Sequence, residues 1–319
     1  MRWLLIPNDG GNDGTARAGR VLHDALAGRG HQVMTVAATA PAALVEPMRS
    51  CDAVLTLSDE GERLALQARR KAGRGAILRR VAAAQRVTPV RGRGNAAVAY
   101  LFTTRADAER AELPSGAVRG GLLVPSVARA RAMSVPNQPP HVAIVADARD
   151  LRGAHDAVRA VAAVMRGHPE LRLVVLGAAD GADALRVHAG ALGVADRVAT
   201  SPAFDHPGWL RTALAAWVVA EGDDGCYAVR DAAAHGIPIV CSRAHGMAKV
   251  FAADAGLVLL APDGAAVGSA AVAEWLGAPE VRREVGERLW RAADAPAEDP
   301  ADVLERAVAS LRPSRASVA

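Results

Sequence analysis

The sequence predicts an α/β protein made of two doubly wound domains. Its 319 residues exceed what one hydrophobic core usually holds, because single cores stop growing near about 250–300 residues. Short apolar runs alternate with Ala-rich stretches of helical period, which is the pattern of a parallel sheet covered by helices. The pattern is interrupted between residues 126 and 140, where Pro136, Pro139 and Pro140 continue neither a helix nor a strand.

The proline-rich segment is the predicted domain boundary. We expect an N-terminal domain at residues 1–135 and a C-terminal domain at residues 136–319 that includes the last helices. The first domain is predicted to have strands at 3–6, 32–37, 53–57 and 97–103, a helix at 15–29 and a basic helical stretch after the third strand. The second is predicted to have strands at 142–146, 171–176, 198–200, 217–220, 237–241 and 257–260, helices at 154–166, 182–192, 226–235 and 248–255, and two more helices within 279–311.

Positive charge is concentrated in one part of the first domain. Residues 1–140 contain 20 Lys and Arg against 11 Asp and Glu, whereas residues 141–319 contain 18 against 23. Eleven basic residues and no acidic one lie from Arg63 to Arg105. Such a stretch could bind an anionic or lipid-linked acceptor or make peripheral contact with an acidic membrane, or it could be a solvated helix face. Nucleic acid is not expected, because Tyr100 and Phe102 fit a strand core and leave no stacking platform.

The cysteines and the lack of long apolar runs indicate a cytoplasmic protein. Cys51, Cys226 and Cys241 stand far apart, which favours reduced core thiols over a disulfide or a metal site. No apolar run reaches the about 18 residues that span a bilayer, and the start of the chain is too short for a signal-peptide core. We therefore expect a cytoplasmic location, with the inner face of the membrane as a further option.

Candidate ligand-binding residues follow the predicted strands, because open α/β sheets bind ligands beyond the carboxyl ends of their strands. After the first strand, Gly10 and Gly11 would let the backbone approach a ligand at a helix N-terminus, although a tight turn explains them as well. In the second domain, Arg152 begins a helix, where a guanidinium could hold a diphosphate by bidentate hydrogen bonds. A solvated first helical turn is the alternative interpretation.

The loop after the strand at 217–220 contains the most candidates. Asp223 and Asp231 are eight residues apart, so we expect one carboxylate in the loop and the other two turns into the next helix. There they could accept hydrogen bonds from sugar and ribose hydroxyls, while Gly225 and Cys226 at the helix N-terminus would face phosphates. Ordinary matching of acids to the helix dipole explains the same pattern. His245, after the following strand, could contact the ligand or relay a proton, or be a surface histidine.

Four ordered segments of the second domain carry a family resemblance. They are HPELRLVVLG at 168–177, LGVADRV at 192–198, DAAAHGIPIV at 231–240 and DAGLV at 254–258. They resemble the segments HPxxxLxxxG, LGLxDRV, EAMAxGxPVV and DAGLLV of the donor lobe in GT-B retaining glycosyltransferases, specifically glycosyltransferase family 4. In the first domain, only the glycine loop and RGHQV at 29–33 are similar to the family.

The resemblance implies a function and assigns roles to residues. It implies two facing Rossmann-like lobes and a hexosyltransferase that uses a nucleotide-diphosphate sugar, with retention and with neither a metal nor a cofactor. By position, Asp223 and Asp231 match the two glutamates of the family that contact the donor sugar and the ribose. Arg152 matches the basic residue that binds the diphosphate, so the catalytic pair would be Arg152 and Asp223. Donor binding would also involve Gly10, Gly11, Glu221, Gly225, Cys226, Asp231 and His245.

The sequence also departs from the family pattern. Both glutamates are aspartates, the usual arginine after the first donor-lobe strand is Asp147, and Glu221 is an alternative first carboxylate. Two other functions therefore stay open. One is a catalytically inactive glycosyltransferase-like binding or scaffold subunit, and the other is a sugar-nucleotide epimerase on the same fold.

Overall fold

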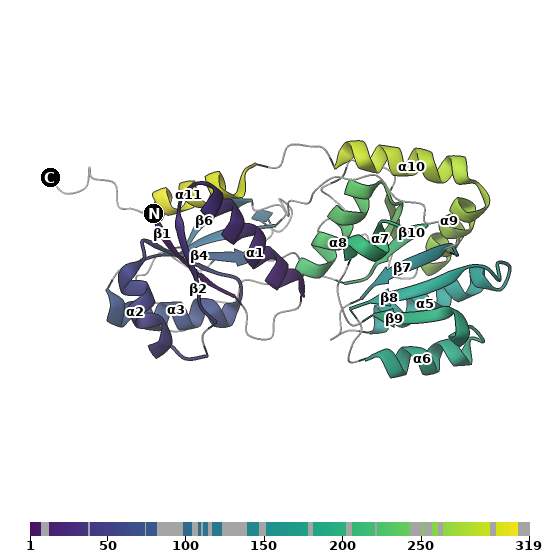
Figure 1. The fold of residues 1–319 in the computed structure, drawn as a ribbon, viewed down its shortest axis with the longest axis horizontal. Helices are drawn as coiled ribbons and strands as arrows, with labels where there is room; N and C mark the ends of the chain where they lie inside the picture. The colour runs from purple at the N-terminus through teal and green to yellow at the C-terminus, as the bar shows by residue number, and fades with distance from the viewer. Residues whose placement is uncertain are drawn as a thin grey trace. The chain divides into compact units, whose positions relative to one another are not determined.

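The computed structural model contains two compact α/β units (Figure 1). The first unit comprises Met1–Pro125 and Ala297–Ala319, and the second comprises Ser126–Pro296. Each unit is built on a six-stranded sheet in which every strand pairing is parallel. The structure describes residues 1–7, 13–37, 39–73, 75–81, 98–103, 108–109, 111–113, 117–122, 139–146, 151–177, 181–201, 206–220, 222–242, 251, 257–260, 264–293 and 298–311.

The sheet of the first unit has the strand order β2-β1-β3-β4-β5-β6. The strands are β1 (Arg2–Ile6), β2 (Gln32–Thr35), β3 (Ala53–Thr56), β4 (Ala76–Val81), β5 (Val98–Phe102) and β6 (Ala117–Leu122). The helices are α1 (Asp13–Gly28), α2 (Ala42–Ser50), α3 (Asp59–Ala72) and α11 (Pro300–Leu311). α1 and α11 pack on one face of the sheet, and α2 and α3 pack on the other. β3 and β5 are buried along their whole length, which explains their uninterrupted apolar sequences.

α3 illustrates how local sequence sets the ends of a helix. The Ser58 hydroxyl accepts a hydrogen bond from the Gly61 backbone N–H at 3.0 Å, which satisfies one of the free donors of the first turn. Acidic residues follow in that turn and basic residues occupy the last, both in favourable orientation to the helix dipole. Gly73 ends the helix in the left-handed conformation, with φ of 77°. The residues at both ends of α3 are therefore those expected where a helix begins and ends.

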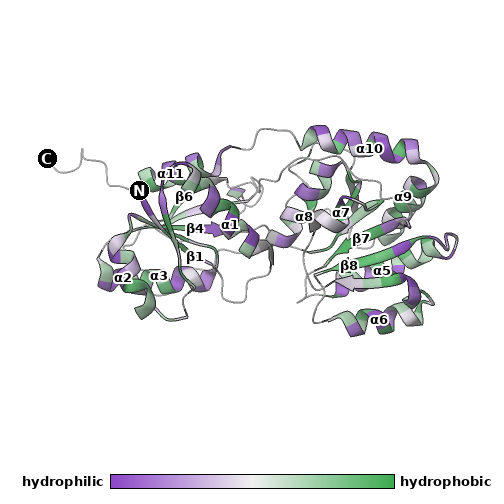
Figure 2. Ribbon diagram, in the orientation of Figure 1, coloured by the Kyte–Doolittle hydropathy of each residue, from purple (hydrophilic) through white to green (hydrophobic). Residues whose placement is uncertain are grey.

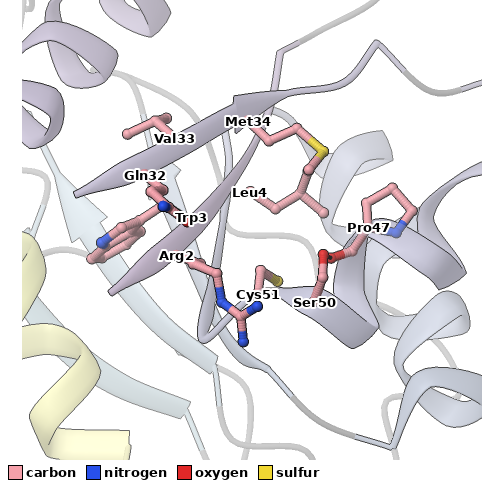
Figure 3. Close-up of a pocket in the computed structure, with 9 residues that line it drawn as sticks. All are labelled: Arg2, Trp3, Leu4, Gln32, Val33, Met34, Pro47, Ser50 and Cys51. Atoms are coloured by element: carbon pink, nitrogen blue, oxygen red, sulfur yellow. Dashed lines mark hydrogen bonds between the residues drawn. The ribbon is translucent and has the colours of Figure 1, made fainter.

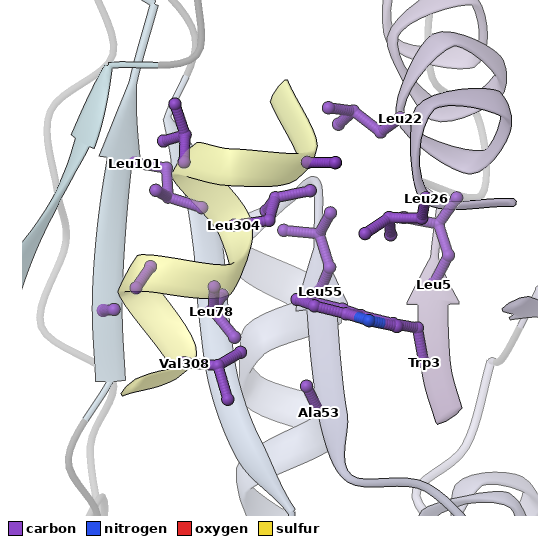
Figure 4. Close-up of a cluster of buried hydrophobic side chains, with 14 of the residues drawn as sticks. Trp3, Leu5, Leu22, Leu26, Ala53, Leu55, Leu78, Leu101, Leu304 and Val308 are labelled. Atoms are coloured by element: carbon purple, nitrogen blue, oxygen red, sulfur yellow. The ribbon is translucent and has the colours of Figure 1, made fainter. Parts of the chain in front are cut away.

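The last helix belongs to the first unit, which differs from our expectation that the C-terminal helices complete the second domain. The side chains of Leu304 and Val308 on α11 join the core formed by Leu5, Leu55 and Leu101 of the first sheet (Figure 4). Arg29, which follows α1, also forms ion pairs with Asp299 at 2.8 Å and with Asp302 at 2.7 Å. An amphipathic helix packs its apolar face against an apolar sheet surface that no other helix covers. For α11, strands β4, β5 and β6 provide that surface.

We predict that Leu304→Ala destabilises the first unit. Leu304 is fully buried, and truncation of a buried leucine typically costs about 2–5 kcal/mol, because it removes apolar contacts and leaves a cavity. Hydrogen exchange read peptide by peptide should show the loss of protection in β1, β3 and β5. The control is Val267→Ala, which alters a side chain that is 58% exposed and should change stability by less than about 0.5 kcal/mol. Loss of protection confined to the second unit would contradict the assignment of α11.

Two arginines of the basic stretch lie inside the first sheet, so they cannot form part of a surface patch. Arg79 and Arg80 of β4 are each only 2% exposed. The Arg79 guanidinium is 2.8 Å from the Asp59 carboxylate and 3.9 Å from the fully buried Glu62 carboxylate. The Tyr100 hydroxyl donates to Glu62 at 2.8 Å. The expected basic surface is therefore corrected at these two positions, because opposite charges and a hydroxyl on α3 and β5 compensate the buried guanidinium of Arg79.

The sheet of the second unit has the strand order β12-β11-β10-β7-β8-β9. Its strands are β7 (His141–Val145), β8 (Arg172–Leu176), β9 (Val198–Ser201), β10 (Ala215–Val218), β11 (Ile239–Ser242) and β12 (Leu257–Leu260). Its helices are α5 (Arg152–Met165), α6 (Ala182–Ala191), α7 (His206–Leu210), α8 (Gly222–His235), α9 (Ala265–Gly277) and α10 (Pro279–Ala292). β7 and β8 are predominantly hydrophobic, whereas α10 alternates between polar and apolar residues (Figure 2). The helix predicted at 248–255 lies largely outside the described residues.

The three cysteines confirm the prediction of core thiols. Cys51, Cys226 and Cys241 are buried and free.

In the described part of the chain, no helix combines the length and the apolar character needed to cross a membrane.

Candidate functional site

The candidate site lies where the strand order of the second sheet reverses. β7 is the first strand of this unit, β8 and β9 extend the sheet on one side, and β10, β11 and β12 extend it on the other. In open parallel sheets, ligands bind beyond the carboxyl ends of the two strands at such a reversal. The segments that leave β7 and β10 are therefore the first place to look for functional residues.

Backbone contacts hold the ends of β7 and β10 together. The N–H groups of Val219 and Ala220 both donate to the Val145 carbonyl, each at 2.9 Å. Gly153, in the first turn of α5, lies so close to Val219 that a Cβ on Gly153 would be 3.1 Å from the Val219 Cβ. The start of α5 thus contacts the segment that connects β10 to α8. This packing places Arg152, the preceding residue, beside the end of β10.

Arg152 lies at the beginning of α5, at the edge of the sheet that carries the candidate site. It is the first residue of α5 and is exposed. The residue before it, Leu151, offers no side-chain cap to the N–H groups of the first turn. Free N–H groups at a helix N-terminus attract anions, and an arginine beside them adds a full positive charge. This end of α5 is suited to a phosphate or carboxylate.

α8 begins one turn earlier than the sequence predicts. The helix starts at Gly222, so Asp223 lies in its first turn and not in the preceding loop. Gly225 and Cys226 are the fourth and fifth residues, and their N–H groups already bond within the helix. They therefore lie beyond the first three residues of the helix, 222–224, whose N–H groups have no acceptor within the helix. At 3.6 residues per turn, Asp223 and Asp231 are about 12 Å apart along the axis and about 80° apart around it.

One face of α8 carries polar residues that are almost completely buried. Asp224 and Asp231 are 1% and 2% exposed, and His235 is 5% exposed. Their spacings of seven and four residues put them on the same face of the helix. Each of them interacts with other groups of the protein. The predicted ribose ligand Asp231 is thus held in a packed setting. The sequence analysis missed Asp224 and His235, although helical spacing from Asp231 identifies both.

Several predicted residues lie outside the described part of the chain. Gly10 and Gly11 follow β1, Glu221 precedes α8, and His245 follows β11. Asp147, which departs from the family pattern, also belongs to this group. For Asp223 the structure gives the backbone position in α8 but not the side chain.

The C-terminal end of α8 is fixed by a backbone contact with α10. Gly236 follows α8 with φ of 71°, a conformation that glycine adopts without strain. A Cβ on Gly286 of α10 would overlap the Gly236 carbonyl group. The two glycines allow the helices to approach closely, and this contact fixes the position of α8 against the rest of the unit.

We predict that Gly286→Ala weakens the packing of α8 against α10 and lowers the stability of the second unit. The added methyl group meets backbone atoms that cannot rotate away, and such overpacking typically costs about 1–3 kcal/mol. Urea unfolding should show the lower stability, and hydrogen exchange should show weaker protection along α8. The matched control is Gly190→Ala in α6, where a Cβ has no neighbour within 4 Å; alanine there should be neutral or stabilising by up to about 1 kcal/mol. Equal behaviour of the two variants would rule out the close α8–α10 contact.

The described residues do not indicate a cysteine nucleophile in β11 or a metal site. Burial raises the pKa of the Cys241 thiol to about 12, so this residue stays protonated and is a poor nucleophile at neutral pH. No cluster of three or more His, Cys, Asp or Glu side chains that could hold a metal ion occurs among the residues that the structure describes.

A pocket of about 170 Å³ lies at the amino edge of the first sheet (Figure 3). Its walls come from the start of β1, from β2 and from the end of α2, and include Trp3, Met34 and Cys51. Parallel sheets bind ligands at the other edge, beyond the carboxyl ends of their strands. The pocket is largely apolar, and we assign it no role in catalysis.

Comparison with known proteins agrees with the geometry of the second unit. The family described as Glycosyl transferases group 1 matches residues 129–289, half of the chain. The chain belongs to this family. The matched segment contains Arg152 and the whole of α8, so the group 1 glycosyl transferase domain and the candidate site coincide. No curated protein matches the sequence.

Solved structures of GT-B glycosyltransferases share the fold of this group 1 glycosyl transferase. HepE from Anabaena, in complex with UDP-glucose, matches with a TM-score of 0.75 at 12% identity, over 98% of this chain and 99% of HepE. Sucrose-phosphate synthase from Thermosynechococcus elongatus matches with a TM-score of 0.70 at 18% identity, over 96% and 97%. WaaG, a glycosyltransferase involved in lipopolysaccharide biosynthesis, matches with a TM-score of 0.64 at 15% identity, over 98% and 100%. The GT-B fold with two parallel-sheet units is thereby confirmed.

Proposed function

We propose that the protein transfers a sugar from a nucleotide-diphosphate sugar to a hydroxyl of an acceptor, with retention at the anomeric carbon. The observation that carries the proposal is the position of two anion-binding features at one edge of the second sheet. Arg152 begins α5 after β7, the first turn of α8 follows β10, and β7 and β10 are neighbouring strands. A diphosphate is the ligand that two such features suit best.

The proposed chemistry depends on stabilising the leaving group. The bond from the anomeric carbon to the diphosphate oxygen breaks, and negative charge develops on the departing nucleotide diphosphate. Arg152 and the N-terminus of α8, through the helix dipole, would stabilise that charge, in the way that fixed dipoles and donors stabilise an oxyanion. The acceptor oxygen attacks from the face that the leaving group vacates, and the proton of the acceptor hydroxyl passes to the departing diphosphate. This route needs no protein nucleophile, no metal and no cofactor.

The carboxylates of α8 are proposed to bind the rest of the donor. Asp223 in the first turn would accept a hydrogen bond from a sugar hydroxyl, and Asp231 would accept hydrogen bonds from the ribose hydroxyls. This division of roles follows the similarity to glycosyltransferase family 4. Both aspartates are one methylene shorter than the glutamates of that family, so we expect the donor to lie closer to α8.

We predict that Arg152→Ala lowers turnover by at least about 10²-fold, because removing one donor to a developing oxyanion has effects of that size. Donor binding should weaken as well, and thermal stability should hardly change, since the side chain is exposed. The measurement is the rate of nucleotide release with the best donor from a screen.

Arg159→Ala is the matched control for Arg152. Arg159 lies seven residues further along α5, on the same side of the helix, and its exposed side chain pairs with Asp156 at 3.2 Å. Its loss should leave turnover unchanged. If the two substitutions change turnover equally, Arg152 has no specific role in the mechanism.

A catalytically inactive donor-binding subunit is the second candidate function. It is favoured by the aspartates at the two glutamate positions and by Asp147, whose charge would repel a phosphate. A thermal-shift screen with UDP-, GDP- and ADP-sugars tests donor binding, because a ligand that binds only the folded state raises the melting temperature. UDP-glucose is the first compound to test, since HepE was crystallised with it. Binding without nucleotide release would indicate the inactive subunit, and conversion of the donor without an acceptor would indicate an epimerase.

We propose that the acceptor is anionic or lipid-linked and that the first unit binds it. Arg70 and Lys71 at the end of α3 are exposed, so their charges can attract such a molecule or a membrane surface. Arg63, in the first turns of the same helix, is also exposed and pairs with Glu60. Contact with an acidic membrane surface would therefore involve the end of α3 and not the buried Arg79 and Arg80.

A further inference from the structure

The pocket at the amino edge of the first sheet has an apolar wall that is partly exposed to solvent. It lies on the face of the sheet that α2 covers, because Leu4 and Cys51 belong both to its lining and to the core on that face. These two residues are buried and form the inner wall. Met34 of the edge strand β2 is 46% exposed, and Pro47 in the last turn of α2 lies across from it (Figure 3). The pocket thus offers apolar surface to a ligand that reaches it from solvent.

Strand geometry places a positive charge at the outer part of this pocket. Arg2 and Leu4 project from the same face of β1, because alternate residues of a strand share a face. In the parallel register they lie opposite Gln32 and Met34 of β2. The buried Leu4 therefore lines the inner part of the pocket, and the exposed Arg2 and Gln32 line the outer part, where both strands begin.

The guanidinium of Arg2 is available to a ligand. The side chain extends past Cys51 in Figure 3, and it forms neither a hydrogen bond nor an ion pair with the residues that the structure describes. The neighbouring Asp52 carboxylate accepts a hydrogen bond from the backbone N–H of Arg2 at 2.8 Å. Because Asp52 keeps a negative charge nearby and Arg2 is exposed, we expect Arg2 to select for an anion without supplying most of the affinity.

The size of the pocket limits what it can hold. Its volume is about 170 Å³, and a cavity of about 150 Å³ holds a benzene ring, so there is room for about six carbon atoms. A nucleotide sugar is much too large and too polar for this space. An alkyl chain fits it, and each methylene group that leaves water should raise the affinity by about fourfold.

We propose that this pocket binds an alkyl chain that ends in an anionic group, a carboxylate or a phosphate. The chain lies against Leu4, Met34 and Pro47, and the anionic group pairs with Arg2 at the outer part of the pocket. A free molecule of the fatty-acid type and an acidic membrane lipid both offer this chemistry. The site goes beyond the proposed sugar transfer, since it lies at the edge of the first sheet opposite to the carboxyl ends of the strands.

The test is a titration of the full chain with straight-chain carboxylates from butanoate to dodecanoate, followed by NMR of ¹³C-labelled methionine methyl groups. Met34 lines the pocket, whereas Met165 is buried in α5 of the second unit. The Met34 resonance, assigned with Met34→Leu, should shift, and that of Met165 should not. The dissociation constant should fall by about fourfold for each added methylene and level off once about six carbons are buried.

Arg2→Gln tests the charged part of the site. It should weaken the binding of octanoate by about two- to fivefold, the size expected for an exposed ion pair, and leave the binding of 1-octanol unchanged. The matched control is Arg20→Gln in α1, because Arg20 is equally exposed but its helix packs on the other face of the same sheet. The control should keep the affinity of the wild type for both ligands. Both substitutions are at exposed positions, so both variants should fold.

Vesicles distinguish the two sources of such a ligand. If the ligand is a membrane lipid, vesicles of phosphatidylglycerol should displace octanoate from Met34, and vesicles of phosphatidylcholine should not. If neither kind of vesicle displaces octanoate, the ligand is a free molecule.

Three results would overturn the proposal. They are a Met34 resonance that no carboxylate shifts, a dissociation constant that does not depend on chain length, and equal effects of Arg2→Gln and Arg20→Gln on octanoate binding. None of these measurements involves a nucleotide sugar, so the donor screen tests the proposed function independently.

Discussion

The pairing of β7 with β10 is the constraint on which the candidate site depends. Strand order reverses between these two strands, and the Val145 carbonyl accepts hydrogen bonds from both residues that follow β10. The pairing brings the beginnings of α5 and α8 to one edge of the sheet, although they are about 70 residues apart in the sequence. Two helix N-termini and an exposed arginine then face the same region. The proposed phosphate-bearing ligand would be recognised there by backbone geometry first and by side chains second.

The two units treat buried positive charge in opposite ways. In the first unit, Arg79 is compensated by Asp59 and Glu62, and the Tyr100 hydroxyl supports Glu62. That cluster is complete without a ligand and joins α3 to the sheet. In the second unit, Arg230 of α8 is 6% exposed and its Nε makes no hydrogen bond. Removing one member of a buried charge cluster is strongly destabilising, because the other charge is then left unpaired. The two units therefore differ in how a buried arginine is accommodated.

The fold was largely predictable from the sequence because most strands are short apolar runs buried on both faces, as in β3 and β7. β4 was missed because Arg79 and Arg80 interrupt its apolar sequence, and only their partners in the fold make them acceptable in a strand. The start of α8 was predicted too late because Gly222 and Gly225 are typical of a loop, and packing of the helix overrides their low helix propensity. The position of Arg152 at the beginning of a helix was predictable from the sequence, but the burial of Asp231 and Arg230 depends on distant parts of the chain. No local pattern could assign α11 to the first sheet.

The placement of α11 has a consequence for the order of events during synthesis. The first unit is discontinuous, since it needs both the first 125 residues and those after 296, whereas the second unit is contiguous. While the ribosome makes the middle of the chain, Leu5, Leu55 and Leu101 lack the helix that covers them in the finished protein. The second unit can therefore complete its core first, and the first unit must wait until α11 has been made. This reverses the usual N-terminal-first order of folding and leaves an apolar face of the first sheet uncovered until α11 packs on it.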